Sequence, residues 1–239
     1  MVVSLGSHDA EDGFVKGITV GITGYSDFYS QGVLPSRREN RTGILPVRSE
    51  YARLAHDLLN DTPGGVDLRV AFVHWGGNYK PVSDEMREQA ALLLSGDEED
   101  GRHYDLIIGS DGSHTVQEFD YVYPNNGTTG PGRPVLYNIG NFLFHTPGRF
   151  GKSGALPYGT IVHVHLGRDD RPPHRPRFGS MELHCTVVDN RVVDYRPRIC
   201  TADQAAELFA TLGPHVNHRP GDAFATVIFR QEEGGSATT

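Results

Sequence analysis

The sequence predicts an α/β fold in which parallel strands alternate with helices before a run of antiparallel strands begins. The 29 glycines and 15 prolines are more than a helix bundle tolerates. In the first half, apolar runs of strand length alternate with amphipathic segments, the pattern of a parallel sheet with crossover helices. The 239 residues, 37% of them hydrophobic, are enough to bury one sizeable core.

Three strands are expected in the first half. Residues 15–25 combine β-branched residues with small ones and have glycines at both ends, which favours a buried strand. Residues 68–75 are a continuous apolar run that ends at Gly76, as in a strand covered on both faces. Residues 105–109 form a third, shorter strand.

Two helices are expected between these strands. Ser49 can cap the first, which ends at residues 63–65 and carries one apolar stripe: Tyr51, Leu54, Ala55, Leu58 and Leu59. The second covers residues 83–95, begins with Ser83 and Glu85, and turns four side chains inward: Met86, Ala90, Leu93 and Leu94.

The second half is predicted to be mostly strands. They cover residues 133–144, 158–166, 180–188 and 191–199, with a hairpin turn at Asp189 and Asn190 between the last two. A helix at 202–212 and a strand at 225–230 follow, and the charged, proline-rich residues 167–178 read as an exposed loop. We expect a single domain over residues 1–232 and a disordered tail at 233–239.

Composition excludes several classes of function. The formal net charge of −8 argues against nucleic acid as a partner, because such proteins normally present a basic face. The chain has neither a signal peptide nor an apolar run long enough for a membrane span, so as given it is expected to be cytoplasmic. Cys185 and Cys200 fit no zinc or redox spacing; no disulfide framework follows, and their redox state is left open.

Three polar motifs follow predicted strands: HWGGNY at 74–79, GSDGSH at 109–114 and YNIGNF at 137–142. Ligands of open α/β sheets gather at such carboxyl ends of strands. A neutral imidazole there can bind a divalent ion or transfer a proton, and an amide can orient a bound oxygen. Elsewhere, His163 and His165 share one face of a strand, either as a ligand pair or, more commonly, as exposed side chains.

Taken together and in this order, these motifs resemble the CapA family of bacterial capsule and poly-gamma-glutamate synthesis proteins. That family carries a His-Trp-Gly strand end, a Gly-His-His-Pro-His-Val-x-Gln loop and a Tyr-Ser-x-Gly-Asn-Phe-x-Phe strand end. The resemblance covers residues 16–199. It implies a metallophosphatase-like α/β sandwich and a divalent metal ion, Mn, Zn or Fe.

The resemblance also implies roles for particular residues. His74, His114 and Asp111 would be metal ligands, with His114 and Asp111 also catalytic; Asn141, Asn138 and Tyr79 would bind substrate. Asp111 stands where the family has histidines, and it is either an oxygen ligand or a turn residue before Gly112. The structural alternatives are a buried, hydrogen-bonded His74 and an Asn141 that only caps the turn after its strand.

The family's N-terminal Gly-Asp strand end and Asn-His loop have no counterpart before Lys16. We therefore expect a fold that lacks its N-terminal half, whether by truncation, because a partner chain supplies that half, or because metal chemistry was lost. The exposed apolar surface would then favour a partner or a homo-oligomer. The membrane anchor of full-length relatives would lie outside this chain.

The function that the resemblance implies is capsule or poly-gamma-glutamate metabolism, as a metal-dependent hydrolase or phosphoesterase on a phosphate- or peptide-bearing substrate. One alternative is metal-independent acid/base chemistry of the epimerase kind, with His114 and Asp111 exchanging protons. Another is a non-catalytic scaffold or binding subunit.

Overall fold

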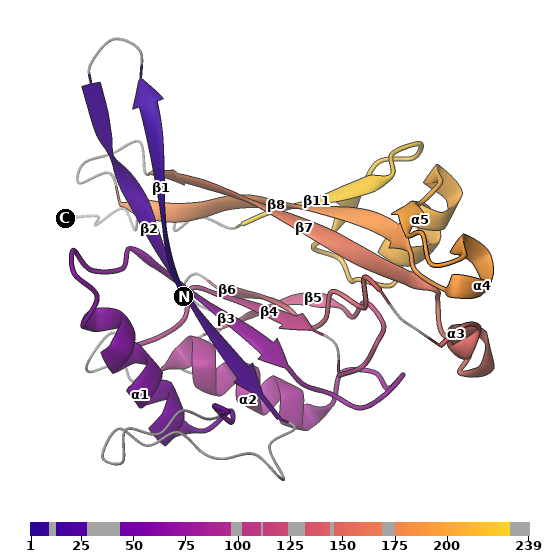
Figure 1. The fold of residues 1–239 in the computed structure, drawn as a ribbon, viewed down its shortest axis with the longest axis horizontal. Coiled ribbons are helices and arrows are strands. Elements are labelled where there is room, and N and C mark those ends of the chain that lie inside the picture. The colour runs from indigo at the N-terminus through magenta and orange to yellow at the C-terminus, as the bar shows by residue number, and fades with distance from the viewer. Residues whose placement is uncertain are drawn as a thin grey trace, which may run out of the picture.

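A computed structural model describes residues 1–9, 13–27, 44–96, 102–110, 112–123, 132–143, 146–168 and 175–229. They form a mixed α/β structure with two stacked sheets (Figure 1). The first sheet contains, in spatial order, β1 (Val2–Asp9), β2 (Gly13–Ser26), β3 (Leu68–His74), β4 (Leu106–Ser110), β6 (Arg133–Leu136) and β5 (Phe119–Val122). The second contains β10 (Asn217–His218), β11 (Phe224–Ile228), β8 (Pro176–Val187) and β7 (Tyr158–Arg168), with β9 (Arg198–Ile199) also paired to β8.

The middle of the first sheet is parallel, as the sequence predicted. The strands β2, β3, β4 and β6 run in one direction, and the two edge strands β1 and β5 are antiparallel to their neighbours. The crossover helices α1 (Ser49–Asn60) and α2 (Asp84–Ser95) lie on the face turned away from the second sheet (Figure 1). This arrangement brings the carboxyl ends of four strands to one edge.

The helix α2 agrees closely with its prediction. The side chain of Ser83 accepts a hydrogen bond from the backbone N–H of Met86, which caps the helix. The buried side chains are the expected Met86, Ala90, Leu93 and Leu94. They pack with β3 and β4 residues in a cluster of apolar side chains that includes Trp75.

The helix α1 differs from its prediction in its cap and its buried face. Arg48 is the N-cap residue and its side chain makes no capping hydrogen bond, so Ser49 begins the helix rather than capping it. The buried residues are Ala52, Ala55, His56 and Leu59, whereas Leu58 is 54% exposed. The buried face is therefore rotated about the helix axis from the predicted stripe: it shares only Ala55 and Leu59 with that stripe.

The core between the sheets draws on alternate residues of the second sheet. In β8, Met181, Leu183 and Cys185 are fully buried and face the first sheet, and Val162 and Val164 of β7 pack on the same cluster. Strand β7 continues to Arg168 and β8 begins at Pro176. The loop predicted at 167–178 is therefore shorter than expected, and its residues 169–174 lie outside the described residues.

Two predicted strands are shorter in the structure. Of residues 133–144 only β6 is a strand, and of residues 191–199 only β9 is. The hairpin expected at Asp189 and Asn190 is instead the start of a short helix, α4 (Asn190–Val193), because the carboxylate of Asp189 accepts hydrogen bonds from the N–H groups of Arg191 and Gly148. The other helices are α3 (Arg149–Lys152) and α5 (Ala202–Phe209).

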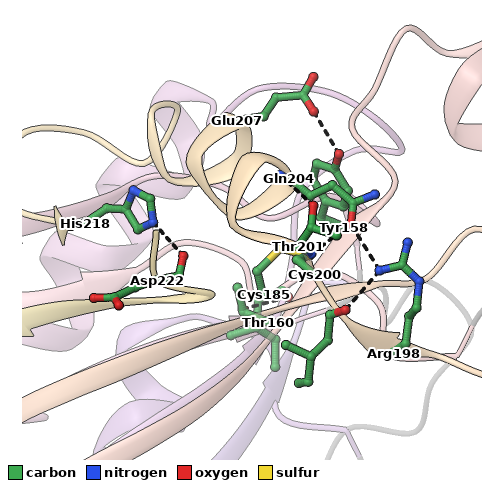
Figure 2. Close-up of a disulfide and its surroundings, with 12 residues drawn as sticks. Tyr158, Thr160, Cys185, Arg198, Cys200, Thr201, Gln204, Glu207, His218 and Asp222 are labelled. Atoms are coloured by element: carbon green, nitrogen blue, oxygen red, sulfur yellow. Dashed lines mark hydrogen bonds between the residues drawn. A yellow bond between two sulfur atoms is a disulfide. The ribbon is translucent and has the colours of Figure 1, made fainter. Parts of the chain in front are cut away.

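A disulfide joins Cys185 to Cys200, whose thiols the sequence had left without a pairing. It links β8 to the segment between β9 and α5, beside the capping box of Thr201 and Gln204 (Figure 2). Both cysteines belong to the core between the sheets. Within the described parts of the chain, we find no helix with the length and apolar character needed to cross a bilayer; the predicted tail at 233–239 lies outside them.

Candidate functional site

The candidate site lies at the edge where the parallel strands of the first sheet end. In the sheet register, His74 at the end of β3 is paired with Ser26 of β2 on one side and Ser110 of β4 on the other. The chain that leaves β6 continues through residues 137–141 along the same edge, where the backbone N–H of Ile139 donates to the carbonyl of Gly109. All three sequence motifs therefore meet at one edge.

Trp75 and two glycines hold these motifs together. The indole Nε1–H of Trp75 donates to the carbonyl of Tyr137 over 2.7 Å. A Cβ at Gly109 would lie 1.8 Å from the Tyr137 carbonyl, and a Cβ at Gly112 would lie 1.8 Å from that of Trp75. Only glycine permits these approaches. Trp75 is completely buried, so it supports the site from below rather than lining a pocket.

His114 and Asn141 are in direct contact. The Asn141 Nδ2 lies 3.2 Å from the Nδ1 of His114, and the backbone N–H of Asn141 donates to the carbonyl of His114 over 3.4 Å. His114 has φ of +66°, a left-handed conformation that is uncommon outside glycine and is enriched at functional loops. Tyr79 packs on His114, with ring centroids 5.2 Å apart.

The orientation of the Asn141 amide is linked to the tautomer of His114. With the amide nitrogen at Nδ1, that ring nitrogen accepts and a neutral imidazole carries its hydrogen on Nε2. Turning the amide by 180° places Oδ1 there instead, so that Nδ1–H donates. In both orientations Asn141 engages Nδ1 and holds the imidazole ring in place.

Asn138 lies in the turn that follows β6. It is completely buried, and its Oδ1 accepts from the backbone N–H of Gly140 over 2.8 Å, in a turn where Gly140 has φ of +70°. Its Oδ1 therefore shapes the turn, whereas its Nδ2 is buried without a hydrogen-bond partner among the described residues, and contact with substrate stays a prediction. The turn also explains why the strand predicted over 133–144 stops at Leu136.

Tyr79 lies between His114 and a pocket of about 310 Å³. Two polar atoms of the pocket residues, the hydroxyl of Tyr79 and Oε1 of Gln117, are buried and have no hydrogen-bond partner among the described residues. Burial raises the pKa of Tyr79 above its ordinary value, so the hydroxyl is protonated at neutral pH and can donate. The pocket also includes Lys80, Thr115 and Ser153.

Gln117 was not predicted as a site residue, although it closes the family motif three residues after His114. Its backbone N–H donates to the carbonyl of Asn138 over 2.9 Å, and its side-chain Nε2 donates to that of Lys80 over 2.9 Å. Its position in the motif was the signal, but only the structure shows that it joins the segment after the second motif to Lys80, just beyond the first motif, and to Asn138 in the third.

The predicted metal ligands cannot be assembled from the described residues alone. His74 and His114 both come from this edge, but Asp111 lies outside the described residues. No group of three metal-ligating side chains occurs at the edge in the part of the chain that the structure describes; such a group occurs at His163, Glu182 and His184 on the second sheet. Metal binding by His74, His114 and Asp111 thus stays a prediction.

One comparison with known proteins is informative. The family model described as bacterial capsule synthesis protein PGA_cap matches residues 13–146. No curated protein matches the chain. The matched residues include all three motifs of the strand-end edge, together with β2 to β6.

Proposed function

The chain belongs to the PGA_cap family of bacterial capsule synthesis proteins, and on this basis we propose that it hydrolyses a bond in a capsule polymer of the poly-gamma-glutamate kind. The reaction would take place at the edge of the first sheet that carries His114 and Asn141. The bond would be an amide or a phosphate ester, in keeping with a peptide- or phosphate-bearing substrate.

The observation that carries this proposal is the contact between Asn141 and Nδ1 of His114. Because that contact holds the imidazole ring at Nδ1, His114 is positioned to exchange a proton with substrate or water. A positioned proton-transfer group typically contributes on the order of 10²–10⁴-fold in rate. Asn141 would act as a positioning residue for this step.

The pocket beside Tyr79 is the proposed substrate site. The buried hydroxyl of Tyr79 and Oε1 of Gln117 would each gain a hydrogen bond from a polar group of the substrate; an unpaired buried polar atom costs about 1–3 kcal/mol. Lys80 at the pocket supplies a cation for a carboxylate or phosphate. A local cation matters because the chain as a whole has a net charge of −8.

Metal dependence is a separate part of the proposal. If Asp111 joins His74 and His114, a divalent ion there would polarise the bond or activate water. His114 would then be one of the ligands, with Asn141 holding its ring at Nδ1, as outer partners of ligating histidines commonly do. The proton-transfer role of His114 predicts activity without metal, whereas the ligand role predicts that a chelator abolishes it.

The disulfide bears on where the protein works. Disulfides persist in oxidising compartments and are rare in the cytoplasm. A buried bond between Cys185 and Cys200 therefore supports a site of action outside the cytoplasm, in place of the location expected from the sequence. Capsule polymers are also found at the cell surface, where such a bond would be stable.

The test is turnover of poly-gamma-glutamate and of a phosphomonoester by the wild type, His114→Ala and a control, His218→Ala, with and without added Mn²⁺, Zn²⁺ or Fe²⁺ and with a chelator. His218 is a suitable control because its Nε2 hydrogen bonds to the carbonyl of Asp222 on the second sheet. We expect His114→Ala to lose about 10²-fold or more and His218→Ala to match wild type. Equal rates in wild type and His114→Ala would show that catalysis does not need His114, and no turnover under any condition would leave a non-catalytic scaffold as the better account.

A further inference from the structure

The outer face of the second sheet carries a cluster of imidazole and carboxylate side chains. Successive residues of a strand point to opposite faces, so His163 of β7 and both Glu182 and His184 of β8 point away from the core that Val162, Val164, Leu183 and Cys185 occupy. His163 is paired directly with Glu182 in the register of β7 and β8. The backbone pairing thus places the three side chains together.

The distances suit a metal ion. One ligand atom from each of His163, Glu182 and His184 lies within 4.8 Å of the others. The Nε2 of His184 is 3.1 Å from Oε2 of Glu182, and the two imidazole rings are 4.7 Å apart between centroids. Ligands bound tetrahedrally at roughly 2.0–2.1 Å from zinc are about 3.3 Å apart, so small side-chain rotations would close the set.

The strand that supplies two of the ligands is held firmly. Strand β8 pairs with β7 on one side and with β11 and β9 on the other, and the residue after His184 forms the disulfide to Cys200. The ring of His184 stacks on Phe224, with centroids 5.5 Å apart and planes at 27°. Rigid support of this kind lowers the cost of bringing ligands together.

His165 orients the carboxylate between the two ligand histidines. Its Nε2 lies 3.3 Å from Oε1 of Glu182, while Oε2 of the same carboxylate faces His184. An outer partner on one carboxylate oxygen directs the other oxygen toward the ion. His165 would therefore be a positioning residue rather than a ligand.

We propose that His163, Glu182 and His184 form a zinc site on the outer face of the second sheet, distinct from the edge that carries His114. Two imidazoles and one carboxylate are a ligand set that zinc accepts, with the fourth position left for water or an external ligand. Calcium and magnesium prefer oxygen ligands throughout. The inference does not depend on the hydrolytic function.

The test is zinc titration by calorimetry of the untagged, chelator-treated full chain, repeated with cobalt to record the visible spectrum of the bound ion. We expect the wild type to bind one zinc. His163→Ala, His184→Ala and Glu182→Gln should lose that zinc or bind it with more than about 100-fold lower affinity, since changing even an outer partner of a ligand typically costs 10–100-fold in affinity. His165→Ala should weaken binding less, and His218→Ala should bind as wild type. The ligand variants should melt as wild type does, because their side chains are on the sheet surface.

Three results would overturn the site. One is the absence of saturable zinc binding by the wild type. Another is unchanged binding in both His163→Ala and His184→Ala. The third is a zinc equivalent that disappears in His114→Ala but persists in His163→Ala, because that ion would belong to the strand-end edge.

Discussion

Reduction of the Cys185–Cys200 disulfide should destabilise the protein by about 3 kcal/mol. The two cysteines are 15 residues apart in sequence, and chain entropy assigns about that value to a loop of this length. For a chain of this size, 1 kcal/mol corresponds to roughly 2–4 °C in melting temperature, so the melting temperature should fall by about 6–12 °C. The effect is mainly on the unfolded chain, which gains freedom once the loop is open.

Urea unfolding of the wild type with and without a reductant measures the stability that the disulfide contributes. The double variant Cys185→Ala, Cys200→Ala is the control. The variant should show no response to reductant, although its buried alanines leave a cavity between the sheets. Titration of thiols in the denatured, unreduced protein should find none. Two titratable thiols, or a wild-type midpoint that is the same in both buffers, would refute the reasoning.

Three further predictions concern the core and the edge. The free energy of unfolding should fall by about 1–2 kcal/mol from pH 7 to pH 5 because of His56. Burial and, second, the charge of Arg69 lower the pKa of His56 to about 4 in the folded protein. The stability that the neutral imidazole contributes is complete above the unfolded pKa near 6.5 and is lost as pH falls toward the folded value. His56→Gln should flatten that slope, and an unchanged slope would contradict it. Gly109→Ala should cost roughly 2–4 kcal/mol in chemical unfolding, because its Cβ would meet the Tyr137 carbonyl; Gly24→Ala, with open space around it, should be near neutral, and equal effects would count against the packing. Tyr79→Phe should keep or raise the melting temperature, because the hydroxyl has no hydrogen-bond partner in the described structure, yet weaken polymer binding; a lower melt with unchanged binding would show a structural role.

Local signals in the sequence were sufficient for much of the first sheet. The capping residue Ser83 and the spacing of Met86, Ala90, Leu93 and Leu94 predicted both the start and the buried face of α2, because these features act within a few residues. For α1 the same approach chose a stripe that is rotated from the buried face and omits Ala52 and His56. Its true face is set by how the sheet covers it, which is a tertiary contact.

Features that depend on distant contacts could not be predicted. The strand after residue 133 stops early because Trp75 bonds the Tyr137 carbonyl and Gly140 turns the chain. The disulfide joins cysteines whose spacing has no motif. The turn at Asp189 is helical because its carboxylate also binds the N–H of Gly148, a residue 41 positions away in sequence.

At the candidate site, the order of the three motifs predicted which strand ends would meet, because carboxyl ends of parallel strands share an edge. It did not predict that Asn141 would engage Nδ1 of His114. That contact needs the left-handed backbone at His114, which no sequence pattern required. The sequence also could not decide whether His163 and His165 are a ligand pair or simply exposed side chains. Their shared partner, Glu182, comes from another strand.

The most direct test of the central claim is a titration of the histidine ring signals by NMR with a short gamma-glutamate oligomer. The account predicts that the His114 resonances, assigned with His114→Gln, shift first and saturate with the binding isotherm, while those of His163 and His184 stay in place. The Tyr79→Phe variant should need more oligomer for the same shift. A titration that moves the second-sheet histidines and leaves His114 unchanged, or that moves none of them, would contradict the claim that substrate binds at the strand-end edge.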